Sequence, residues 1–382
     1  MEFADPRTLS RPERLDWLRL IRSENVGPIT FRQLLTRFGT PAAALEALPA
    51  LARRGGRMRP VAVCSRAAAE RELTAIEDLG ARLLALCEPD YPPALAALDD
   101  APPILTAAGH SHLLERNALA VVGARNASAN GRRLARQIAA DLGREGLLVV
   151  SGMARGIDAA AHEGALESGT AAVVAGGIDV IYPEENATLY EAIKARGALL
   201  SEMPLGTVPQ ARHFPRRNRL ISGVALGALV VEAAPRSGSL ITARFALEQG
   251  REVFAVPGSP LDPRARGCNN LIRQGAVLVE SAADVLDALA GPLATPVGER
   301  KGAEFLATAP ARLDEAEVAT VRRQVEELLG PTPVTVDELI RQCQVSPALV
   351  HMALLELELA GRTERHPGNR VSSIVGQAAE AL

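Results

Sequence analysis

The sequence has few cysteines, and this scarcity limits its chemistry. No two of its four cysteines form a Cys-x-x-Cys pair; they are Cys64, Cys87, Cys268 and Cys343. That spacing typically marks a zinc site or a redox pair, and a disulfide framework needs cysteines at a much higher density. We therefore expect reduced thiols in a cytoplasmic protein, with no metal site and no disulfide.

Long apolar runs are also missing. A helix that crosses a bilayer needs roughly 20 consecutive apolar residues, and no stretch of the chain approaches that length. Residues 1–17 contain no apolar core of the kind that a secretion signal needs. We expect neither a membrane partner nor export.

Lysine occurs only at Lys194 and Lys301, so arginine is the ordinary basic residue here and only its local clustering is informative. The formal net charge is −3. Residues 212–219, called here the basic loop, contain no acid; their basic residues are Arg212, His213, Arg216, Arg217 and Arg219. An apolar run at 228–231 and the turn Ser237-Gly238-Ser239 follow. If that run is a strand of a parallel sheet, loop and turn would face one crevice, a site for a polyanion. The alternative is a solvated arginine loop beside an ordinary strand-to-helix turn.

Short apolar runs alternate with helical patterns through the middle of the chain. The expected strands are 120–123, 147–150, 171–175, 198–200, 228–232, 252–256 and 276–279. The expected helices between them are 130–144, 157–166 and 240–249. This alternation predicts the α/β class, with a doubly wound, mostly parallel sheet like an extended Rossmann fold.

The rest of the chain divides by composition. Residues 1–88 predict a helical domain with helices at 14–21, 30–38 and 66–79. The predicted core domain is 89–290, and it begins with a proline-rich connector at 89–103. A linker is expected at 291–312. Residues 313–382 predict a winged helix: three helices followed by a hairpin at 362–372.

Two features of these flanking domains have open functions. Residues 25–28, Asn-Val-Gly-Pro, resemble the turn of a helix-hairpin-helix, which binds phosphates through backbone N–H groups, but Asn25 replaces the first glycine. A packing or interaction role is the alternative. The would-be reading helix of the winged helix, 347–360, carries Glu356 and Glu358 and no arginine, and phosphates would repel it. Protein binding or regulation is as good an explanation for it as DNA binding.

The carboxyl ends of the expected strands are rich in small residues. They carry Gly123, Ser151-Gly152, Gly176-Gly177, Ser237-Gly238-Ser239 and Pro257-Gly258. Glycine lets a phosphate approach the backbone, and the N-termini of following helices offer free N–H groups and a positive dipole. Several such turns in register predict a phosphate-bearing ligand. The chain has neither a Gly-x-Gly-x-x-Gly turn nor a Gly-x-x-x-x-Gly-Lys-Ser/Thr loop, so we expect no dinucleotide cofactor and no nucleotide hydrolysis.

Catalytic constellations are sparse. Asp158 and His162 share a helix face at i, i+4, which would suit a metal or an acid–base pair. The alternative, which we favour, is that Asp158 stabilises the start of its helix and His162 packs locally. Ser151, Ser201 and Ser239 lack the motif of a nucleophilic serine. We therefore expect a protein that is not an enzyme.

Seven motifs occur in order between residues 121 and 276. They are VGARNASANG (122–131), SGMARGIDAAAH (151–162), GGIDVIYPEEN (176–186), FPRRNRLISG (214–223), VVEAAPRSGSLITA (230–243), REVFAVPG (251–258) and GCNNLIRQGA (267–276). As a set they resemble the DNA-processing protein A (DprA, also called Smf) family of bacterial natural-transformation proteins. The resemblance implies a Rossmann-like core that forms a homodimer, binds and protects single-stranded DNA without base-sequence specificity, and loads the RecA recombinase onto it. It implies no enzymatic step.

The same resemblance assigns DNA-binding roles residue by residue. The assigned residues are Gly123, Arg125, Arg212, Phe214, Arg216, Arg217, Asn218, Arg219, Ser237, Gly238, Ser239 and Thr242. Two of them have a structural alternative. Phe214 either stacks on a base or anchors the loop in the core, and Asn218 either touches DNA or orders the loop.

A second hypothesis is a nucleotide-processing enzyme related to the lysine-decarboxylase-like phosphoribohydrolases, which share this type of sheet. Those enzymes carry a Pro-Gly-Gly-x-Gly-Thr-x-x-Glu signature whose glutamate does chemistry. The nearest run here, residues 236–243, has no glutamate. Hydrolysis is therefore the less favoured hypothesis.

Overall fold

The computed structural model describes residues 7–294, 314–366 and 368–374. These residues form two compact units, each treated by itself below. The sheet unit is the described part of Arg71–Arg300, together with Arg7 and Thr8. The end unit combines Leu9–Glu70 with the described part of Lys301–Leu382.

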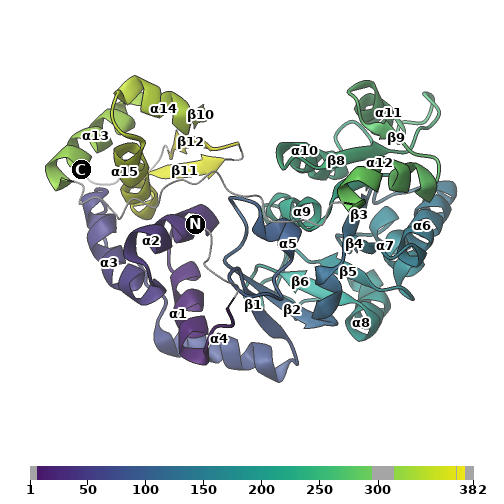
Figure 1. Cartoon of the computed structure of the whole chain (residues 1–382), viewed down its shortest axis with the longest axis horizontal. Coiled ribbons are helices and arrows are strands. Elements are labelled where there is room, and N and C mark those ends of the chain that lie inside the picture. Colours follow the sequence, from purple (N-terminus) through teal and green to yellow (C-terminus); the bar gives the residue numbers. More distant parts are fainter. Residues whose placement is uncertain (1–6, 295–313, 367, 375–382) are drawn as a thin grey trace. The chain divides into compact units, whose positions relative to one another are not determined.

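A nine-stranded sheet forms the centre of the sheet unit, in the order β1-β2-β6-β5-β4-β3-β7-β8-β9 (Figure 1). The strands are β1 (Arg82–Ala85), β2 (Ile104–Gly109), β3 (Ala118–Val122), β4 (Leu148–Ser151), β5 (Thr170–Val173), β6 (Ala198–Ser201), β7 (Gly227–Val230), β8 (Glu252–Ala255) and β9 (Val277–Leu278). Every neighbouring pair from β6 to β9 is parallel. The predicted mostly parallel sheet is confirmed, and each expected strand overlaps an observed one.

The antiparallel edge of the sheet was not predicted. Strands β1 and β2 pair antiparallel, with Arg82 opposite Ala107, and β2 pairs antiparallel with β6. They lie on either side of the proline-rich connector, and β1 falls within 1–88, the range expected to be helical. A four-residue apolar run directly after a helix is too short to be distinguished from the end of that helix by periodicity.

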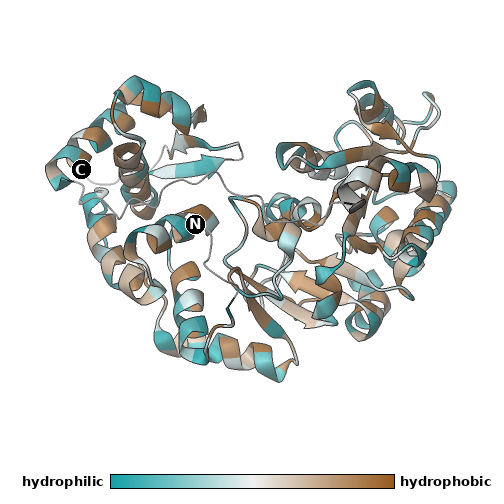
Figure 2. Cartoon of the chain, in the orientation of Figure 1, coloured by the Kyte–Doolittle hydropathy of each residue, from teal (hydrophilic) through white to brown (hydrophobic). Residues whose placement is uncertain are grey.

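The helices of the sheet unit cover the strands and connect them. They are α5 (Pro93–Ala96), α6 (Ala129–Arg144), α7 (Ile157–Ala165), α8 (Ala187–Arg196), α9 (His213–Val224), α10 (Ser239–Glu248), α11 (Arg266–Arg273) and α12 (Ala282–Ala294), with 3₁₀ turns at Ser111–Glu115 and Glu184–Asn186. One core cluster joins Leu119 and Val149 of the strands to Ile138 of α6, Ala161 of α7 and Val285 of α12. The apolar strands stand out in Figure 2, as expected of strands buried on both faces.

The order of the strands reverses at β3. From β3 the chain runs through β4, β5 and β6 on one side, and it returns to place β7, β8 and β9 on the other. In a doubly wound sheet such a reversal opens a crevice outside the carboxyl ends of the strands. The predicted phosphate-binding turns follow the strands at this edge.

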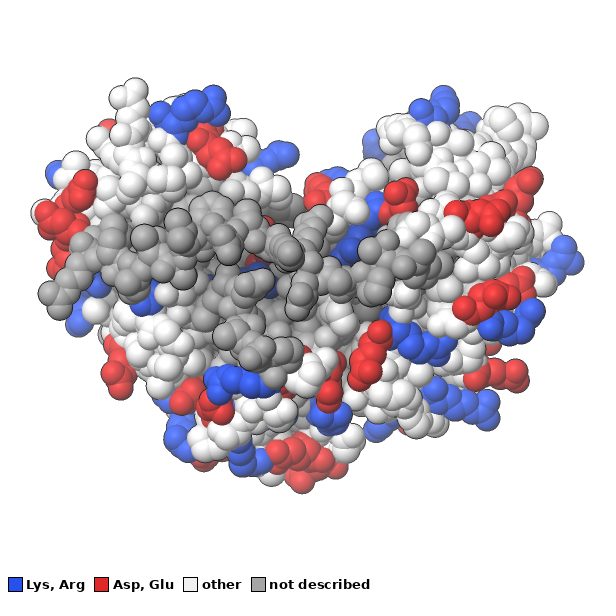
Figure 3. Space-filling model, viewed as in Figure 1, with Lys and Arg blue, Asp and Glu red and all other residues white. Residues whose placement is uncertain are grey.

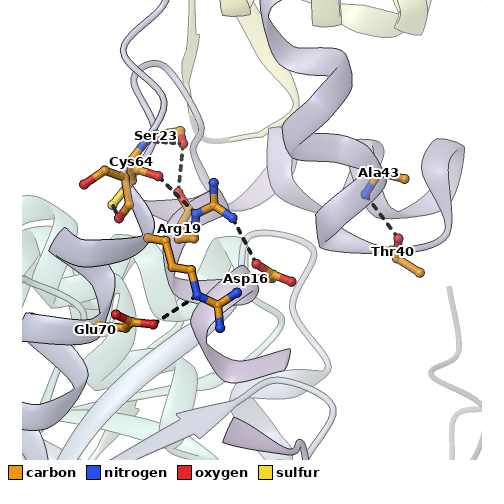
Figure 4. Close-up of polar contacts among 9 residues, drawn as sticks. Asp16, Arg19, Ser23, Thr40, Ala43, Cys64 and Glu70 are labelled. Carbon is orange, nitrogen blue, oxygen red and sulfur yellow. Dashed lines mark hydrogen bonds and ion pairs between the residues drawn. The ribbon is translucent and has the colours of Figure 1, made fainter. Parts of the chain in front are cut away.

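The end unit contains the N-terminal helices α1 (Arg11–Ile21), α2 (Pro28–Phe38) and α3 (Pro41–Arg54) and the first part of α4 (Arg66–Asp78). Cys64 accepts a hydrogen bond from Arg19 and donates one to Ser23, which ties the segment before α4 to α1 (Figure 4). Helix α3 was not predicted, because Pro49 interrupts its pattern. Thr40 caps its start by accepting from the N–H of Ala43 at 3.2 Å.

The C-terminal part of the end unit is a winged helix, as predicted. It consists of α13 (Glu315–Leu328), β10 (Val334–Thr335), α14 (Val336–Cys343), α15 (Pro347–Leu359), β11 (Thr363–His366) and β12 (Arg370–Ser373). The expected hairpin is the β11–β12 pair. The expected linker begins too early, since residues 291–294 continue helix α12; its other residues lie outside the described ranges.

Two surface properties accompany this fold. On the face drawn in Figure 3, Lys and Arg side chains lie among Asp and Glu side chains, in keeping with the net charge of −3. Within the described ranges, none of the helices has the length and apolar character that crossing a bilayer requires.

Close packing of α6 on α7 predicts the effect of one methyl group. A Cβ at Gly164 would lie 2.2 Å from the carbonyl oxygen of Arg136, so Gly164→Ala should force the helices apart. We expect a loss of about 1–3 kcal/mol in the free energy of unfolding, measured by chemical denaturation. In the control Gly238→Ala, the same methyl meets no atom within 4 Å. Equal stability of the two variants would contradict the proposed packing.

Candidate functional site

Two adjoining pockets lie at the carboxyl ends of the parallel strands. Pocket A has a volume of about 720 Å³ and lies beyond β4 and β5; pocket B has about 850 Å³ and lies beyond β3 and β7. Both pockets are lined by Arg125, Ala154, Tyr182, Pro209, Phe214 and Arg217. The crevice expected from the strand order is therefore present, and a cluster of aromatic and basic residues stands between its halves.

The basic loop is not a loop, so that prediction was wrong. Residues 213–224 form helix α9. Pro215 lies in the first turn of the helix, where a backbone N–H would have no intrahelical acceptor and its absence costs nothing. A proline among arginines reads as a loop in the sequence, although this position is one that a helix tolerates.

The side chains at the start of α9 point to two different faces of the helix. Phe214, Arg217 and Asn218 line the pockets. Arg216 and Arg219 instead form ion pairs with Glu202, and Arg219 also donates to the carbonyl of Asp100 at 2.7 Å. The structure therefore does not bring Arg216 and Arg219 into the crevice.

Arg212, just before α9, is exposed and lines neither pocket. Of the four arginines predicted in this segment, Arg217 alone lines both pockets. The clustering in the sequence overstated how much of this charge faces the crevice.

Arg125 and Arg217, from separate elements, meet at the ring of Phe214. The guanidinium carbon of Arg125 lies 5.2 Å from the ring centre and that of Arg217 lies 5.8 Å from it. The ring of Tyr182 lies 5.8 Å from that of Phe214, tilted by 59°. Arg125 is exposed, Tyr182 is 47% exposed and Phe214 is half-buried. The site thus offers a cation and two aromatic rings to the same open space.

Arg217 is buried and bonds to the protein itself. Its Nη1 donates to the carbonyl oxygens of Gly152 and Val173, at the ends of β4 and β5, and its Nε donates to Asn218 at 3.2 Å. A side chain at residue 152 would collide with this guanidinium, since a Cβ there would lie 2.5 Å from Nη1. Gly152, expected to face a phosphate, makes room for Arg217.

Asp158 supplies the charge opposite Arg217. It is buried at the start of α7, where it accepts a hydrogen bond from the N–H of Ala154 at 3.3 Å. Burial raises the pKa of Asp158, and the Arg217 charge opposes that rise. Burial lowers the pKa of Arg217 to about 10. The charge of Asp158 raises that pKa, and the charge of Arg125 lowers it further. Arg217 and Asp158 together hold the floor of the crevice.

The turn before α10 forms the wall of pocket B. Ser237, Gly238, Ser239 and Thr242 all line it, and Gly123 lies at its β3 side. The hydroxyls of Ser237 and Ser239 lie 2.8 Å apart, and Gly238 faces open space. Asn218 donates to the carbonyl of Gly238 at 3.3 Å, so it orders this turn. In the first turn of α10, the N–H groups of Ser239, Leu240 and Ile241 donate to Ser237 and Gly238. This turn therefore offers an anion the positive end of the helix dipole.

Several residues of the crevice, among them Tyr182, Arg155 and Arg236, were not predicted as site residues. Tyr182 and Arg155 line pocket A, and Arg236 lines pocket B. Arg155 forms an ion pair with Glu185 at 3.4 Å, whereas Arg236 is exposed and has no ion-pair partner among the described residues. All three lie within the motifs quoted above. That Tyr182 lies near Phe214 could be seen only from the folded structure.

Asp158 and His162 have structural partners, in line with the alternative favoured from the sequence. His162 is fully buried, and its Nδ1 lies 2.8 Å from the hydroxyl of Thr170. That hydroxyl donates to the carbonyl of Val149, so it accepts from Nδ1–H. Burial, with help from Arg217, lowers the pKa of His162 to about 3. Within the described ranges, no cluster of three or more His, Cys, Asp or Glu side chains is arranged to hold a metal ion.

Three family models match the chain. The model described as DNA recombination-mediator protein A matches residues 82–290, the DprA-like N-terminal HHH domain matches 11–75, and the DprA winged helix domain matches 309–369. Together they follow the order of helical domain, sheet core and winged helix.

Two similar proteins are named Smf and DprA. Protein Smf of Escherichia coli (strain K12) is 41% identical over 288 residues, covering 74% of each chain. DNA processing protein DprA of Bacillus subtilis (strain 168) is 43% identical over 222 residues, covering 57% of this chain and 75% of that one.

Two solved structures resemble this one. The X-ray structure of DprA from Streptococcus pneumoniae has a TM-score of 0.60 and 35% identity, covering 73% of this chain and 98% of that one. A structure of DNA processing protein A from Helicobacter pylori, reported for its single-stranded DNA binding mode, has a TM-score of 0.51 and 27% identity, covering 55% and 95%.

The internal bonding of Arg217 predicts a stability effect. Arg217→Ala would leave Asp158 without its opposite charge and two buried carbonyls without a donor. We expect it to lower the free energy of unfolding by about 3–5 kcal/mol. Arg125→Ala, at an exposed position, should cost less than about 1 kcal/mol. Chemical denaturation of both variants measures this difference, and equal losses would contradict a structural role of Arg217.

The low pKa of His162 predicts a pH effect. In the unfolded chain the His162 imidazole binds a proton at pH values below about 6.5, whereas in the folded chain it stays neutral down to about pH 3. The free energy of unfolding therefore falls as the pH drops from about 6.5 towards 3. The slope for one proton is about 1.4 kcal/mol per pH unit. The raised pKa of Asp158 acts in the opposite direction, so wild type should be compared with His162→Asn, which keeps a donor for Thr170. Wild type should lose more of its free energy of unfolding between pH 7 and pH 5 than His162→Asn does. An equal loss in the two proteins would refute the expectation.

Proposed function

The chain belongs to the DNA recombination-mediator protein A family, that of DprA and Smf, and on this premise we propose that its crevice binds single-stranded DNA without base-sequence specificity. The protein would protect the strand and load the RecA recombinase onto it during natural transformation. The similarity to the Helicobacter pylori protein, whose structure describes a single-stranded DNA binding mode, supports the choice of ligand.

One observation carries the proposal: Arg125, Phe214 and Tyr182 meet where two pockets join. Single strands are held by positive grooves that follow the backbone and by aromatic rings on which bases stack. Here Arg125 and the start of α10 at Gly238 would hold phosphates, and Phe214 with Tyr182 would stack a base. Neither kind of contact reads base edges, so we expect no sequence specificity.

The twelve residues expected from the sequence take different roles in this proposal. Those that would touch DNA are Gly123, Arg125, Phe214, Ser237, Gly238, Ser239 and Thr242. Those that would position them are Arg217, Asn218 and Arg219, because their side chains bond to the protein. Arg212 and Arg216 are exposed beside the crevice and would attract the strand at longer range.

Further parts of the proposal depend on the family. We infer a cytoplasmic homodimer whose partners are single-stranded DNA and RecA, and which carries out no catalytic step. We also infer a division into a helical N-terminal domain, a sheet core beginning at Arg82, a linker, and a winged helix. No observation favours the phosphoribohydrolase hypothesis.

Salt dependence tests the proposal. Arg125→Ala should weaken binding of a single-stranded oligonucleotide and flatten the log–log salt slope by about 0.7, one phosphate's share. Phe214→Ala should weaken binding by about 1–3 kcal/mol without changing that slope, because stacking releases no counterions. Fluorescence anisotropy at several salt concentrations measures both quantities.

The control for these variants is Arg133→Ala, which removes an exposed arginine that lines neither pocket. Two oligonucleotides of different sequence and a duplex complete the set. Unchanged affinity in both Arg125→Ala and Phe214→Ala would refute the crevice as the binding site. A large preference for one base sequence would refute the proposed contacts.

A further inference from the structure

The hairpin turn of the end unit, residues 25–28, lies against the last turn of helix α15. Asn25 has a left-handed backbone, φ 60°, and its Nδ2 donates to the carbonyl oxygen of Leu359 at 3.2 Å. Gly361, which follows α15 with φ 73°, approaches the same amide group: a Cβ there would lie 3.1 Å from Asn25 Nδ2. The residue that replaces the first glycine of the hairpin therefore binds a helix end.

The two acids of α15 are buried in the same contact. Glu356 is 2% exposed and pairs with Arg54 of α3 at 3.2 Å and with Arg322 of α13 at 2.6 Å. Glu358 is 6% exposed; it accepts from the hydroxyl of Thr30 on α2 at 2.9 Å and pairs with Arg365. Both carboxylates that made this helix look unfit for DNA are thus bonded to groups of the end unit.

Backbone packing closes the contact further. A Cβ at Gly55 would lie 2.0 Å from the carbonyl oxygen of Glu356, so only glycine allows α3 to end against α15. Leu349 to Leu359 are buried except for the half-buried His351, so only the first turn of α15, at Pro347 and Ala348, is exposed. The would-be reading helix is an internal element of the end unit.

We infer that the acidic end of α15 is the resident ligand of the N-terminal hairpin and competes with phosphate for it. A hairpin of this kind holds an anion, and the C-terminal end of a helix carries unpaired carbonyls and a partial negative charge. Of the two carboxylates at this end, Glu358 accepts from Thr30 near the hairpin, and Glu356 pairs with Arg54 of α3. Neither the hairpin nor α15 meets nucleic acid until the two separate, and DNA binding by the resting chain is confined to the sheet unit.

Arg54→Ala in the full chain tests the contact. It removes the α3 side of the ion pair with Glu356, so amide hydrogen exchange should become about tenfold faster in both 25–38 and 347–359. Arg53→Ala is the matched control, because Arg53 is the exposed neighbour and has no ion-pair partner among the described residues. Faster exchange in only one of the two segments would overturn the inference.

Duplex binding tests the competition. In an Arg125→Ala/Phe214→Ala background, which disables the proposed crevice, Arg54→Ala should raise affinity for a duplex oligonucleotide about tenfold and Arg53→Ala should not. The expected gain runs against the charge change, since both variants lose a positive charge. Unchanged or weaker duplex binding in the Arg54 variant would overturn the competition.

A milder variant guards against misfolding. Thr30→Val keeps the shape of the side chain but removes its hydrogen bond to Glu358. It should produce the same paired rise in exchange and the same gain in duplex binding, each smaller than in Arg54→Ala. If Arg54→Ala loses its helical circular dichroism, the result with Thr30→Val decides the inference.

Discussion

A guanidinium buried beneath the crevice is the constraint on which the site depends. Arg217 joins the ends of β4 and β5 through the carbonyls of Gly152 and Val173, faces the charge of Asp158 and lies beside the Phe214 ring. It therefore sets the distance between two loops and supports the ring between the pockets. Arg125 remains exposed near that ring and is available to a ligand. The site thus combines one arginine that supports it with another that faces outward.

Most of the sheet could be predicted from the sequence because strands buried on both faces are continuous apolar runs. Strands β3 to β8 have that pattern, flanked by glycine and serine turns, whereas the edge strand β9 leaves Leu278 exposed. The antiparallel edge could not be predicted, because Arg82–Ala85 is short and its pairing with β2 is a tertiary property. Helix α3 was missed because Pro49 interrupts its periodicity. The motif resemblance supplied the family; periodicity alone supplied only the fold class.

The site was harder to predict than the sheet. Clustering of arginine in 212–219 indicated the right neighbourhood, but which arginine faces the crevice depends on the phase of a helix that was taken for a loop. Glu202 lies outside the basic loop, and its ion pairs with Arg216 and Arg219 decide their orientation. The acids of α15 were visible in the sequence, whereas their partners Arg54 and Thr30 lie some three hundred residues away. Patterns read along the chain cannot reveal such pairs.

The end unit is built from the two extremes of the chain, and this has a consequence for its synthesis. Thr30 and Glu358 are separated by 328 residues. At elongation rates of about 5–20 residues per second, the hairpin waits roughly 15–65 s for its helical partner to be translated. During that interval Asn25 and Thr30 lack their α15 partners, Leu359 and Glu358, while the sheet unit in between can already fold. The helices that precede the sheet unit are thus completed only after it has been made.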